Sequence, residues 1–546
     1  MTDDLCRELQ QLSTVELRDL LSASGHGDLL REDERDEKTE TIADEQLVMD
    51  VKNEGNALFR QGLMVDAISA YTRCLELDST NAICLSNRAA AYLKMKQFDH
   101  AITDCSKAIE VAPTIKSYMR RATAYIALQQ FVEVIIDIEA ALQFEPCNKE
   151  CYTKLQTIVD TATDVSQHAA SATLRRAAVR AAAIVSVRKG WKMHAVRGNP
   201  GPAAVNGHTL FQGTDERVFL FGGRAVRDQK PNVYVLDESD NSSWEVVPIR
   251  GTIAPSSRAW HTTTPIGYRN REFYCVYGGV SSRGEDSRVY LLDSDLRRGF
   301  RWLQPRCLQH SDEAPTSRSG HAAISIVEES GHRVVYIFGG RTKQGVTNQL
   351  LVLRCCSQLD VAPVGTDGVV DPTITWDEIC PHPCGDWPLA RDGHSMCLLQ
   401  SSKYHSPRLI VFGGNGQLND EKMNDVWIYD TEEQLWTLLE CVGDVPQPRS
   451  YHTAHTVGEF MLVVGGRTAE SEDSSLYMLD IGSCEWVKVP VPSDHTLAPR
   501  AWHSSVLTDG GKLFVLGGGT YTGPLKDAAM LDLGYFKTKA PFLRHP

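Results

Sequence analysis

The chain has 546 residues, of which 42% are hydrophobic and 23% charged. This composition excludes collagen-like and wholly disordered proteins, and the length is too great for one hydrophobic core, so several domains are expected. The formal net charge is −14, and the first fifty residues, with fifteen acidic and five basic side chains, contribute −10 of it. Because phosphate binding needs clustered Lys and Arg, a net-acidic chain without a basic stripe is not expected to bind nucleic acid.

The beginning of the chain is acidic and lacks the basic and apolar regions of a signal peptide. No window of eighteen uninterrupted apolar residues occurs either, so we expect neither a membrane span nor secretion. The fifteen cysteines are scattered without a CxxC pair, as in proteins with reduced thiols. We expect a cytoplasmic protein, with a nuclear location left open.

Residues 1–25 show helical apolar spacing that closes at Gly25, and this spacing predicts one short helix. Residues 26–44 are too polar to pack and predict an acidic flexible linker.

Internal repeats organise the next segment. A shift of 34 carries Gly55 onto Ala89, and a further shift of 33 carries Ala89 onto Ala122 and Pro113 onto Pro146. Small residues recur where helices approach closely, with larger apolar residues at helical spacing between them. This pattern resembles three tetratricopeptide (TPR) repeats over residues 45–150. Residues 151–187 continue as helix and are expected to connect the domains and to cap the open end of the solenoid.

Beyond residue 187 the period changes, and all ten tryptophans lie there. Short apolar runs end in Gly-Gly, and in most repeats a second strand and a tryptophan follow; five repeats also carry R-x-x-H. These motifs resemble kelch repeats, each of which forms one four-stranded blade. The resemblance implies a multidomain α and all-β protein, in which an N-terminal TPR α-solenoid precedes a six-bladed kelch β-propeller over residues 188–535 and a C-terminal tail over 536–546. The Gly-Gly pairs begin at Gly222, Gly278, Gly339, Gly413, Gly465 and Gly517.

The ring closure follows from spacing. The last repeat has no tryptophan of its own, whereas Trp191 precedes His208 by seventeen residues, as Trp244 precedes His261. We therefore expect the segment at Trp191 to form the outer strand of the last blade, which removes the exposed sheet edges of an open arc.

The helical repeats also resemble those of co-chaperones that bind the C-terminal Glu-Glu-Val-Asp tails of cytosolic heat-shock chaperones of the seventy- and ninety-kilodalton classes. That family's clamp has Lys-x-x-x-Asn in the first helix, Asn in the third and Lys-x-x-x-Arg in the fifth. Residues four apart share a helix face. The alternative is that the asparagines are structural and the basic residues form an ordinary solvated face. The matching residues here are Lys52, Asn56, Asn87, Lys116 and Arg120.

The propeller repeats carry no recognisable catalytic motif. The R-x-x-H residues recur in successive repeats, so we expect them to serve in hydrogen bonds between blades. Cys380, His382 and Cys384 could hold a metal, but prolines flank the histidine and no fourth ligand is evident. We expect no metal and no cofactor. Aromatic side chains precede the repeat histidine in three blades and are either rim contacts for a partner or core residues: Trp260, Tyr451 and Trp502.

These observations predict a non-enzymatic adaptor. Its TPR clamp would bind a heat-shock chaperone tail, and its propeller would hold a client or an assembly factor. Two alternatives stay open: a scaffold whose TPR repeats bind unrelated internal peptides, and an enzyme with a site in the propeller mouth.

Overall fold

The fold was taken from a computed structural model of the full chain. The expected helix at 1–25, the linker at 26–44 and the end of the tail at 543–546 lie outside the described residues. The chain divides into two compact units, one ending at Cys151 and the other beginning at Tyr152. The structure describes residues 45–542 except 165–170, 195, 198–201, 203–204, 214–215, 226–231, 238–242, 252, 269–270, 283, 295–298, 308–315, 329, 357–371, 382–384, 400–405, 418–420 and 493–495.

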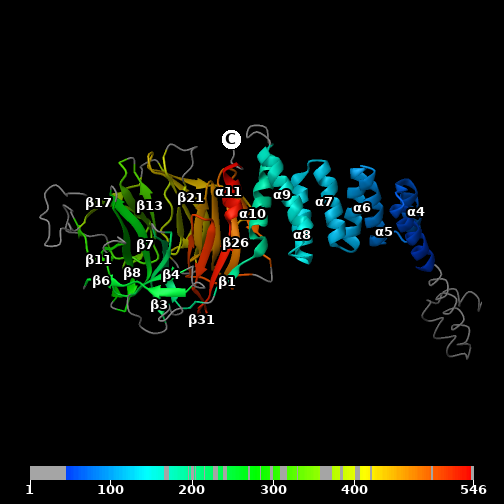
Figure 1. The fold of residues 1–546 in the computed structure, drawn as a ribbon. Coiled ribbons are helices and arrows are strands. Elements are labelled where there is room, and N and C mark those ends of the chain that lie inside the picture. Colours follow the sequence, from blue (N-terminus) through cyan, green and yellow to red (C-terminus); the bar gives the residue numbers. More distant parts are fainter. Residues whose placement is uncertain are drawn as a thin grey trace, which may run out of the picture. The chain divides into compact units, whose positions relative to one another are not determined.

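The first unit consists of helices that each pack on the next (Figure 1). The first described helix covers residues 45–60. Those that follow are α4 (Met64–Leu77), α5 (Ala82–Lys94), α6 (Phe98–Val111), α7 (Ile115–Ala127), α8 (Phe131–Phe144) and α9 (Lys149–Asp164), the last of which crosses the boundary between the units.

The structure confirms helical repeats at the predicted period. Gly62, Lys96 and Gln129, which occupy equivalent positions in successive repeats, all have left-handed φ and end the first helix of each repeat. The small residues aligned between repeats are completely buried, because only a methyl group fits where two helices approach closely: Ala67, Ala89, Ala101, Ala108, Ala122 and Ala141.

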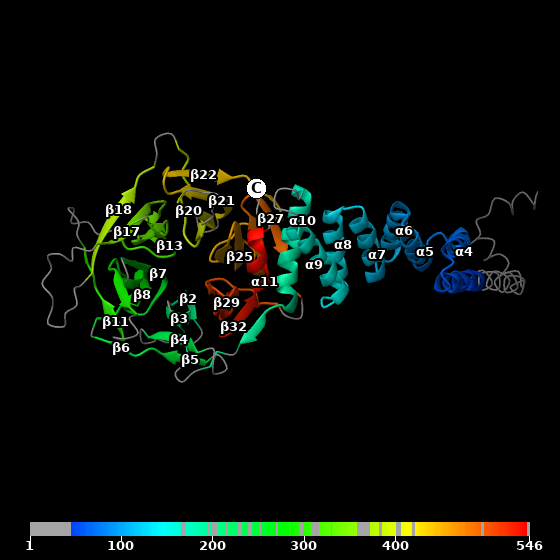
Figure 2. The same ribbon diagram turned by 45° about the horizontal axis from the view of Figure 1, so that its top comes forward.

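The second unit is built from antiparallel four-stranded sheets around a common centre, a β-propeller-like arrangement (Figure 2). The described strands fall into six groups of four, of which the second and third in chain order are joined into one larger sheet; the six-bladed count itself stays a prediction. In chain order the groups are β2 (Val205–Gln212), β3 (Val218–Ala225), β4 (Val233–Asp237) and β5 (Ser243–Val246); β7 (Arg258–Tyr268), β8 (Arg271–Ser281), β10 (Tyr290–Asp293) and β11 (Phe300–Leu303); β13 (Ala322–Val327), β14 (Arg333–Phe338), β17 (Leu350–Cys356) and β18 (Thr373–Ile379); β19 (Ser395–Leu399), β20 (Arg408–Asn415), β21 (Lys422–Asp430) and β22 (Leu435–Leu439); β24 (Thr453–Val457), β25 (Phe460–Arg467), β26 (Glu472–Asp480) and β27 (Glu485–Val489); and β28 (Ser504–Leu507), β29 (Lys512–Leu516), β32 (Ala528–Asp532) and β1 (Lys192–His194).

Short strands complete the sheets or form two-stranded ribbons. They are β6 (Ile249–Arg250), β9 (Gly284–Glu285), β12 (Arg306–Cys307), β15 (Arg341–Thr342), β16 (Gly345–Val346), β23 (Val442–Gly443), β30 (Gly519–Thr520) and β31 (Gly523–Pro524).

The Gly-Gly pairs lie where neighbouring groups of strands meet. Gly278 has a φ of +69°, and a Cβ there would lie 2.3 Å from the carbonyl oxygen of Arg318 in the next group. The adjacent Gly279 N–H donates to that same oxygen at 2.8 Å. Only glycine tolerates both the left-handed backbone and this close approach.

Tryptophans of the outer strands join the groups through aromatic contacts. Trp302 packs on Phe221 of the preceding group, and Trp376 packs on Tyr277, each with ring centroids 5.1 Å apart. The partner ring directly precedes a Gly-Gly pair in both cases. The repeated tryptophan therefore packs one blade against the next.

The predicted closure is confirmed. Strand β1, directly after Trp191, pairs antiparallel with β32, and Lys192 lies opposite Met530. Trp191 itself is only 2% exposed. The chain segment before the first sheet thus completes the sheet formed by the end of the chain.

Helix α10 (Ala172–Ser186) belongs to the second compact unit. Arg176 and Arg180 of α10 form ion pairs with Glu485 and Asp444 of the propeller at 3.1 and 3.7 Å. Its alanine-rich sequence allows close packing, and α10 contacts α11 (Gly534–Lys539), a helix that overlaps the start of the predicted tail. A short 3₁₀ helix, Val187–Lys189, leads from α10 to β1, and another, Ala540–Phe542, follows α11.

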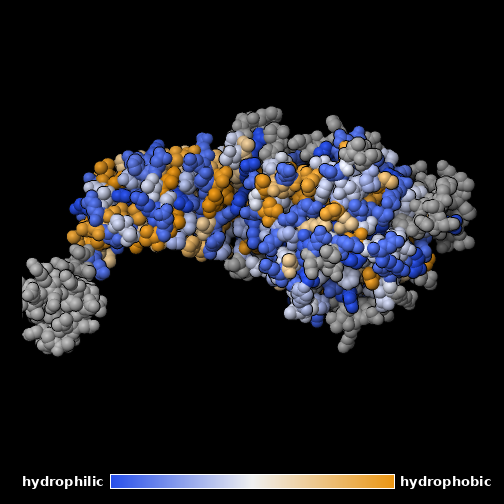
Figure 3. Space-filling model, turned by 180° about the vertical axis from the view of Figure 1, so that it is seen from behind, coloured by the Kyte–Doolittle hydropathy of each residue, from blue (hydrophilic) through white to orange (hydrophobic). Residues whose placement is uncertain are grey.

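In the described part of the chain, every helix is too short or too polar to cross a membrane. Hydrophobic and hydrophilic residues are interspersed over the surface of both units on the face shown in Figure 3.

Candidate functional site

The predicted clamp residues lie on the first helix of each repeat. Lys52 and Asn56 are on helix 45–60, Asn87 is on α5, and Lys116 and Arg120 are on α7.

Three of the five clamp residues are joined in one line of hydrogen bonds. Asn87 Nδ2 donates to Asn56 Oδ1 at 3.0 Å, and Arg120 Nη1 lies 3.4 Å from Asn87 Oδ1. The structure thus brings together Asn56, Asn87 and Arg120 from three helices.

Arg120 is a partly buried cation without a carboxylate partner among the described residues. Its Nη1 donates to the carbonyl and the hydroxyl oxygens of Ser86, at 2.7 and 2.6 Å. Burial is the main influence on its pKa, which is lowered, with small opposing contributions from Cys105 and Tyr71. A desolvated guanidinium bound only to neutral groups is a favourable place for an anion.

Two other arginines of the same helices show the contrast. Arg88 forms a bidentate pair with Asp104, and Arg121 forms one with Asp137. Both aspartates are buried, and they occupy equivalent positions in successive repeats. These two arginines connect helices within the repeats, and an aspartate balances the charge of each. No aspartate balances the charge of Arg120 in the same way.

The two lysines differ in setting. Lys116 is exposed and Lys52 is half-buried, and neither makes a hydrogen bond or an ion pair within the described residues. Lys52 lies near Cys84: burial and Cys74 raise the pKa of the Cys84 thiol, and the lysine opposes that rise. Both ammonium groups therefore have donors available for a ligand.

Sequence reasoning missed two residues that hold the clamp. Tyr71 donates its hydroxyl to Asn56 Oδ1 at 2.8 Å, and Ser86 binds Arg120. A signal for Tyr71 was present, because the repeat shift places Cys105 and Ile138 at its position in the other repeats. Ser86 directly precedes Asn87, so its position was visible but its role was not.

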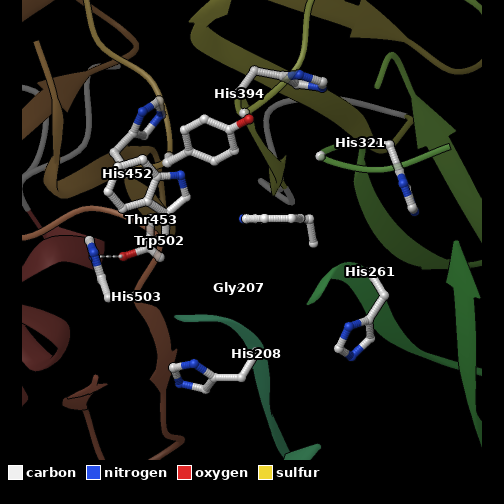
Figure 4. A pocket seen from close by; sticks show the side chains of 13 residues that line it. Gly207, His208, His261, His321, His394, His452, Thr453, Trp502 and His503 are labelled. Carbon is white, nitrogen blue, oxygen red and sulfur yellow. Dashed lines mark hydrogen bonds between the residues drawn. The ribbon is translucent and has the colours of Figure 1, made fainter. Parts of the chain in front are cut away.

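A second candidate site lies at the centre of the propeller unit. A pocket of about 200 Å³ is lined by the repeat histidines and by the residues that precede them (Figure 4). The preceding residues are also linked to one another through the backbone: Gly393 N–H donates to Gly320 at 2.8 Å, Tyr451 N–H to Gly393 at 2.6 Å, and Trp502 N–H to Tyr451 at 3.1 Å.

Four of the six repeat histidines bind a hydroxyl of the preceding blade, which is the role predicted for them; His503 Nε2, for example, lies 3.0 Å from Thr453 Oγ1. Burial is the main cause that lowers the pKa of each, to about 3 for His208 and His394. The histidines are therefore neutral near pH 7, as expected for residues with a structural role. The other contacts are His261 with Thr209, His321 with Thr262 and His452 with Ser395.

The repeat arginines act mainly within their own blade. Arg391 Nη1, for example, donates to the carbonyl of Gly413 at 3.0 Å, and the guanidinium pairs with Asp425. The link between blades runs through the arginine backbone instead, since Arg391 O accepts from Gly340 N–H at 2.8 Å. The predicted side-chain hydrogen bonds between blades are therefore made by the histidines rather than by the arginines.

Trp260, Tyr451 and Trp502 line the central pocket and are only half-buried. All three have left-handed φ, between +53° and +59°. The other three blades carry glycine at this position, and each glycine also has a left-handed φ. Bulky residues in this conformation cost about 1–3 kcal/mol each. The aromatic side chains thus occupy positions where the backbone favours glycine.

Among the described residues, no group of three His, Cys, Asp or Glu side chains is placed to hold a metal ion. His382 and Cys384 lie outside that part of the chain.

Comparison with known proteins places these features in families. The family described as "KLHDC2/KLHL20/DRC7 Kelch-repeats domain" matches residues 184–368 and 369–539, which is more than half of the chain. The chain belongs to this kelch-repeat family. The tetratricopeptide repeat family matches residues 82–114 of the helical unit. TPR and kelch repeats together indicate a protein-interaction adaptor.

Curated relatives match this chain at 26–27% identity. Kelch domain-containing protein 2 from Bos taurus is 27% identical over 321 residues, covering 54% of this chain and 71% of the relative. Kelch domain-containing protein 1 from Mus musculus is 27% identical over 272 residues, covering 45% and 60%. Host cell factor 2 from Homo sapiens is 26% identical over 378 residues, covering 64% and 44%. The chain therefore spans less than two thirds of the length of the last two.

Proposed function

We propose that the protein is a non-enzymatic co-chaperone adaptor of the cytoplasm. Its TPR clamp binds the C-terminal Glu-Glu-Val-Asp tail of a heat-shock chaperone of the seventy- or ninety-kilodalton class, and its kelch propeller holds a client or assembly partner. The observation that carries the proposal is Arg120, a partly buried guanidinium without a carboxylate partner among the described residues and linked to the two clamp asparagines.

The chemistry of the tail suits these donors. A C-terminal aspartate has a main-chain and a side-chain carboxylate, and each needs several convergent donors. Lys52, Asn56 and Asn87 are suited to the main-chain carboxylate, and Lys116 with Arg120 to the side-chain carboxylate. Each charged hydrogen bond contributes about 1.5–3 kcal/mol before desolvation losses.

The test is a pull-down of chaperone from cytosol with the full chain and with the Lys52→Ala, Arg120→Ala double variant. We expect the double variant to lose the chaperone. The matched control removes two positive charges elsewhere on the same repeats, at Arg73 and Lys107, both exposed residues of second helices, and should retain it. Failure of the unaltered chain to capture either chaperone would contradict the proposal.

Lys116→Ala should weaken binding of a Glu-Glu-Val-Asp peptide by on the order of tenfold. A charged hydrogen bond is lost, but Lys116 is exposed and solvent returns part of its value. Isothermal titration calorimetry measures the change. An affinity equal to that of the unaltered chain would remove Lys116 from the clamp.

On the propeller, the left-handed aromatic residues support a partner contact at the central pocket. Trp and Tyr dominate the binding energy of protein interfaces. Aromatic side chains that line a pocket despite backbone strain are suited to anchoring a client.

Trp260→Gly should leave the melting temperature nearly unchanged while reducing client capture. The glycine relieves about 1–3 kcal/mol of strain, which offsets the lost packing of a half-buried ring. Differential scanning calorimetry and cross-linked capture measure the two effects. The matched control is Trp376→Gly in an outer strand, which should cost about 3–5 kcal/mol of stability. A large destabilisation by Trp260→Gly with full client capture would assign the ring to the core.

A further inference from the structure

The amide of Asn56 has a fixed orientation. Its Oδ1 accepts two hydrogen bonds, one from the Tyr71 hydroxyl at 2.8 Å and one from Asn87 Nδ2 at 3.0 Å. A carbonyl oxygen has two acceptor sites, so both are occupied. The Nδ2 group of Asn56 is therefore left with its two N–H donors for a ligand.

The order of donors and acceptors is set from both ends of the line. Arg120 can only donate, so Asn87 must turn its Oδ1 toward the guanidinium and its Nδ2 toward Asn56. Tyr71 supplies a hydroxyl proton from the other side. Both acceptor sites of the Asn56 amide are thus occupied internally, and its N–H donors remain.

Packing holds Tyr71 in place for this role. The side chain is 1% exposed, and its ring lies against Gly55, the neighbour of Asn56, where a Cβ would come within 2.6 Å of the ring. Glycine at this position lets the tyrosine of α4 approach helix 45–60 closely enough to reach Asn56. Burial is the main cause that raises the pKa of Tyr71, so the hydroxyl keeps its proton near neutral pH.

We propose that Tyr71 is a positioning residue that fixes the Asn56 amide with only its N–H donors available to a ligand, and thereby makes the clamp select a carboxylate over a carboxamide. This inference rests on the proposed function. A carboxamide presents N–H groups of its own, and these would face the donors of Asn56, Asn87 and Lys52. Without the tyrosine hydroxyl, the Asn56 amide can rotate and offer its oxygen to such a ligand.

The test uses the full chain carrying Tyr71→Phe, titrated with a Glu-Glu-Val-Asp peptide as free acid and as C-terminal amide. Phenylalanine retains the ring that packs on Gly55. We expect affinity for the free acid to fall about three- to tenfold, the value of one hydrogen bond, and the ratio of free-acid to amide affinity to fall with it. The matched control is Tyr92→Phe, whose half-buried ring stacks on His100, and it should leave both affinities unchanged.

A double-mutant cycle separates positioning from general destabilisation. If Tyr71 acts through Asn56, then Tyr71→Phe has no further effect in the Asn56→Ala background. An equal loss in both backgrounds, or an unchanged free-acid affinity of Tyr71→Phe when Asn56→Ala binds weakly, would overturn the inference.

Nuclear magnetic resonance gives a readout that does not depend on the peptide. In the full chain labelled with ¹⁵N-asparagine, the side-chain NH₂ signal of Asn56 is assigned by its loss in Asn56→Ala. We expect Tyr71→Phe to shift the signals of Asn56 and Asn87, and unchanged signals would overturn the inference. If the unaltered chain binds no peptide, the proposed function fails, and these signals still decide whether Tyr71 orients the amide.

Discussion

A peptide ending in Glu-Glu-Val-Asp with a free carboxylate should bind the chain, and the same peptide with a C-terminal amide should bind on the order of a hundredfold more weakly. The amide removes a negative charge from the donors of Lys52, Asn56 and Asn87. It also places new N–H groups against Asn56, whose two acceptor sites are already occupied. Loss of charge and donor–donor conflict therefore act in the same direction.

Calorimetry with both peptides, at low and at high salt, measures this effect. Affinity for the free acid should fall as salt is added, because exposed Lys116 contributes a screened charge. Two variants distinguish a residue that binds the peptide from one that stabilises the fold. Arg120→Gln should lose peptide binding at nearly full stability. Arg88→Gln breaks the buried pair with Asp104 and should mainly destabilise the fold. Equal affinities for the two peptides would instead favour a scaffold that recognises internal sequences.

A chain that begins at residue 200 should melt at a temperature lower by on the order of 5 °C, with a broader transition, than one that begins at residue 187. The shorter chain lacks β1 and the buried Trp191 and leaves the edge of β32 unpaired. An exposed edge strand pairs readily with other molecules, so the shorter chain should also aggregate.

Helix α10 requires a third chain in this experiment. It packs in the propeller unit and forms ion pairs with Glu485 and Asp444, so a chain that begins at residue 187 already lacks those contacts. Comparison of chains that begin at 171 and 187 isolates α10, and comparison of 187 with 200 isolates β1. If the last two melt alike as soluble monomers, the strand at Trp191 does not stabilise the closure of the ring.

Several features of this protein were determined by local sequence patterns. The period of the helical repeats located the buried alanines, and the distance from Trp191 to His208 located the closing strand. Such features can be read directly because each repeat meets the same steric demands at the same position. A close helix approach admits only a small side chain, and a left-handed turn against a neighbouring carbonyl admits only glycine.

The partners of individual polar side chains depended on the tertiary structure. Arg120 and Arg121 are adjacent in sequence, yet one contacts Ser86 and Asn87 while the other pairs with Asp137. Tyr71 lies fifteen residues from Asn56 and reaches it only because α4 packs closely on the preceding helix at Gly55. Burial also sets the chemistry of these charged and titratable groups. A guanidinium that is removed from water and bound only to neutral groups attracts an anion, and removal of water keeps the repeat histidines neutral. Spacing in the sequence reveals positions where every repeat meets the same steric demand. Hydrogen-bond partners and loss of water are decided only when segments distant in the sequence pack together.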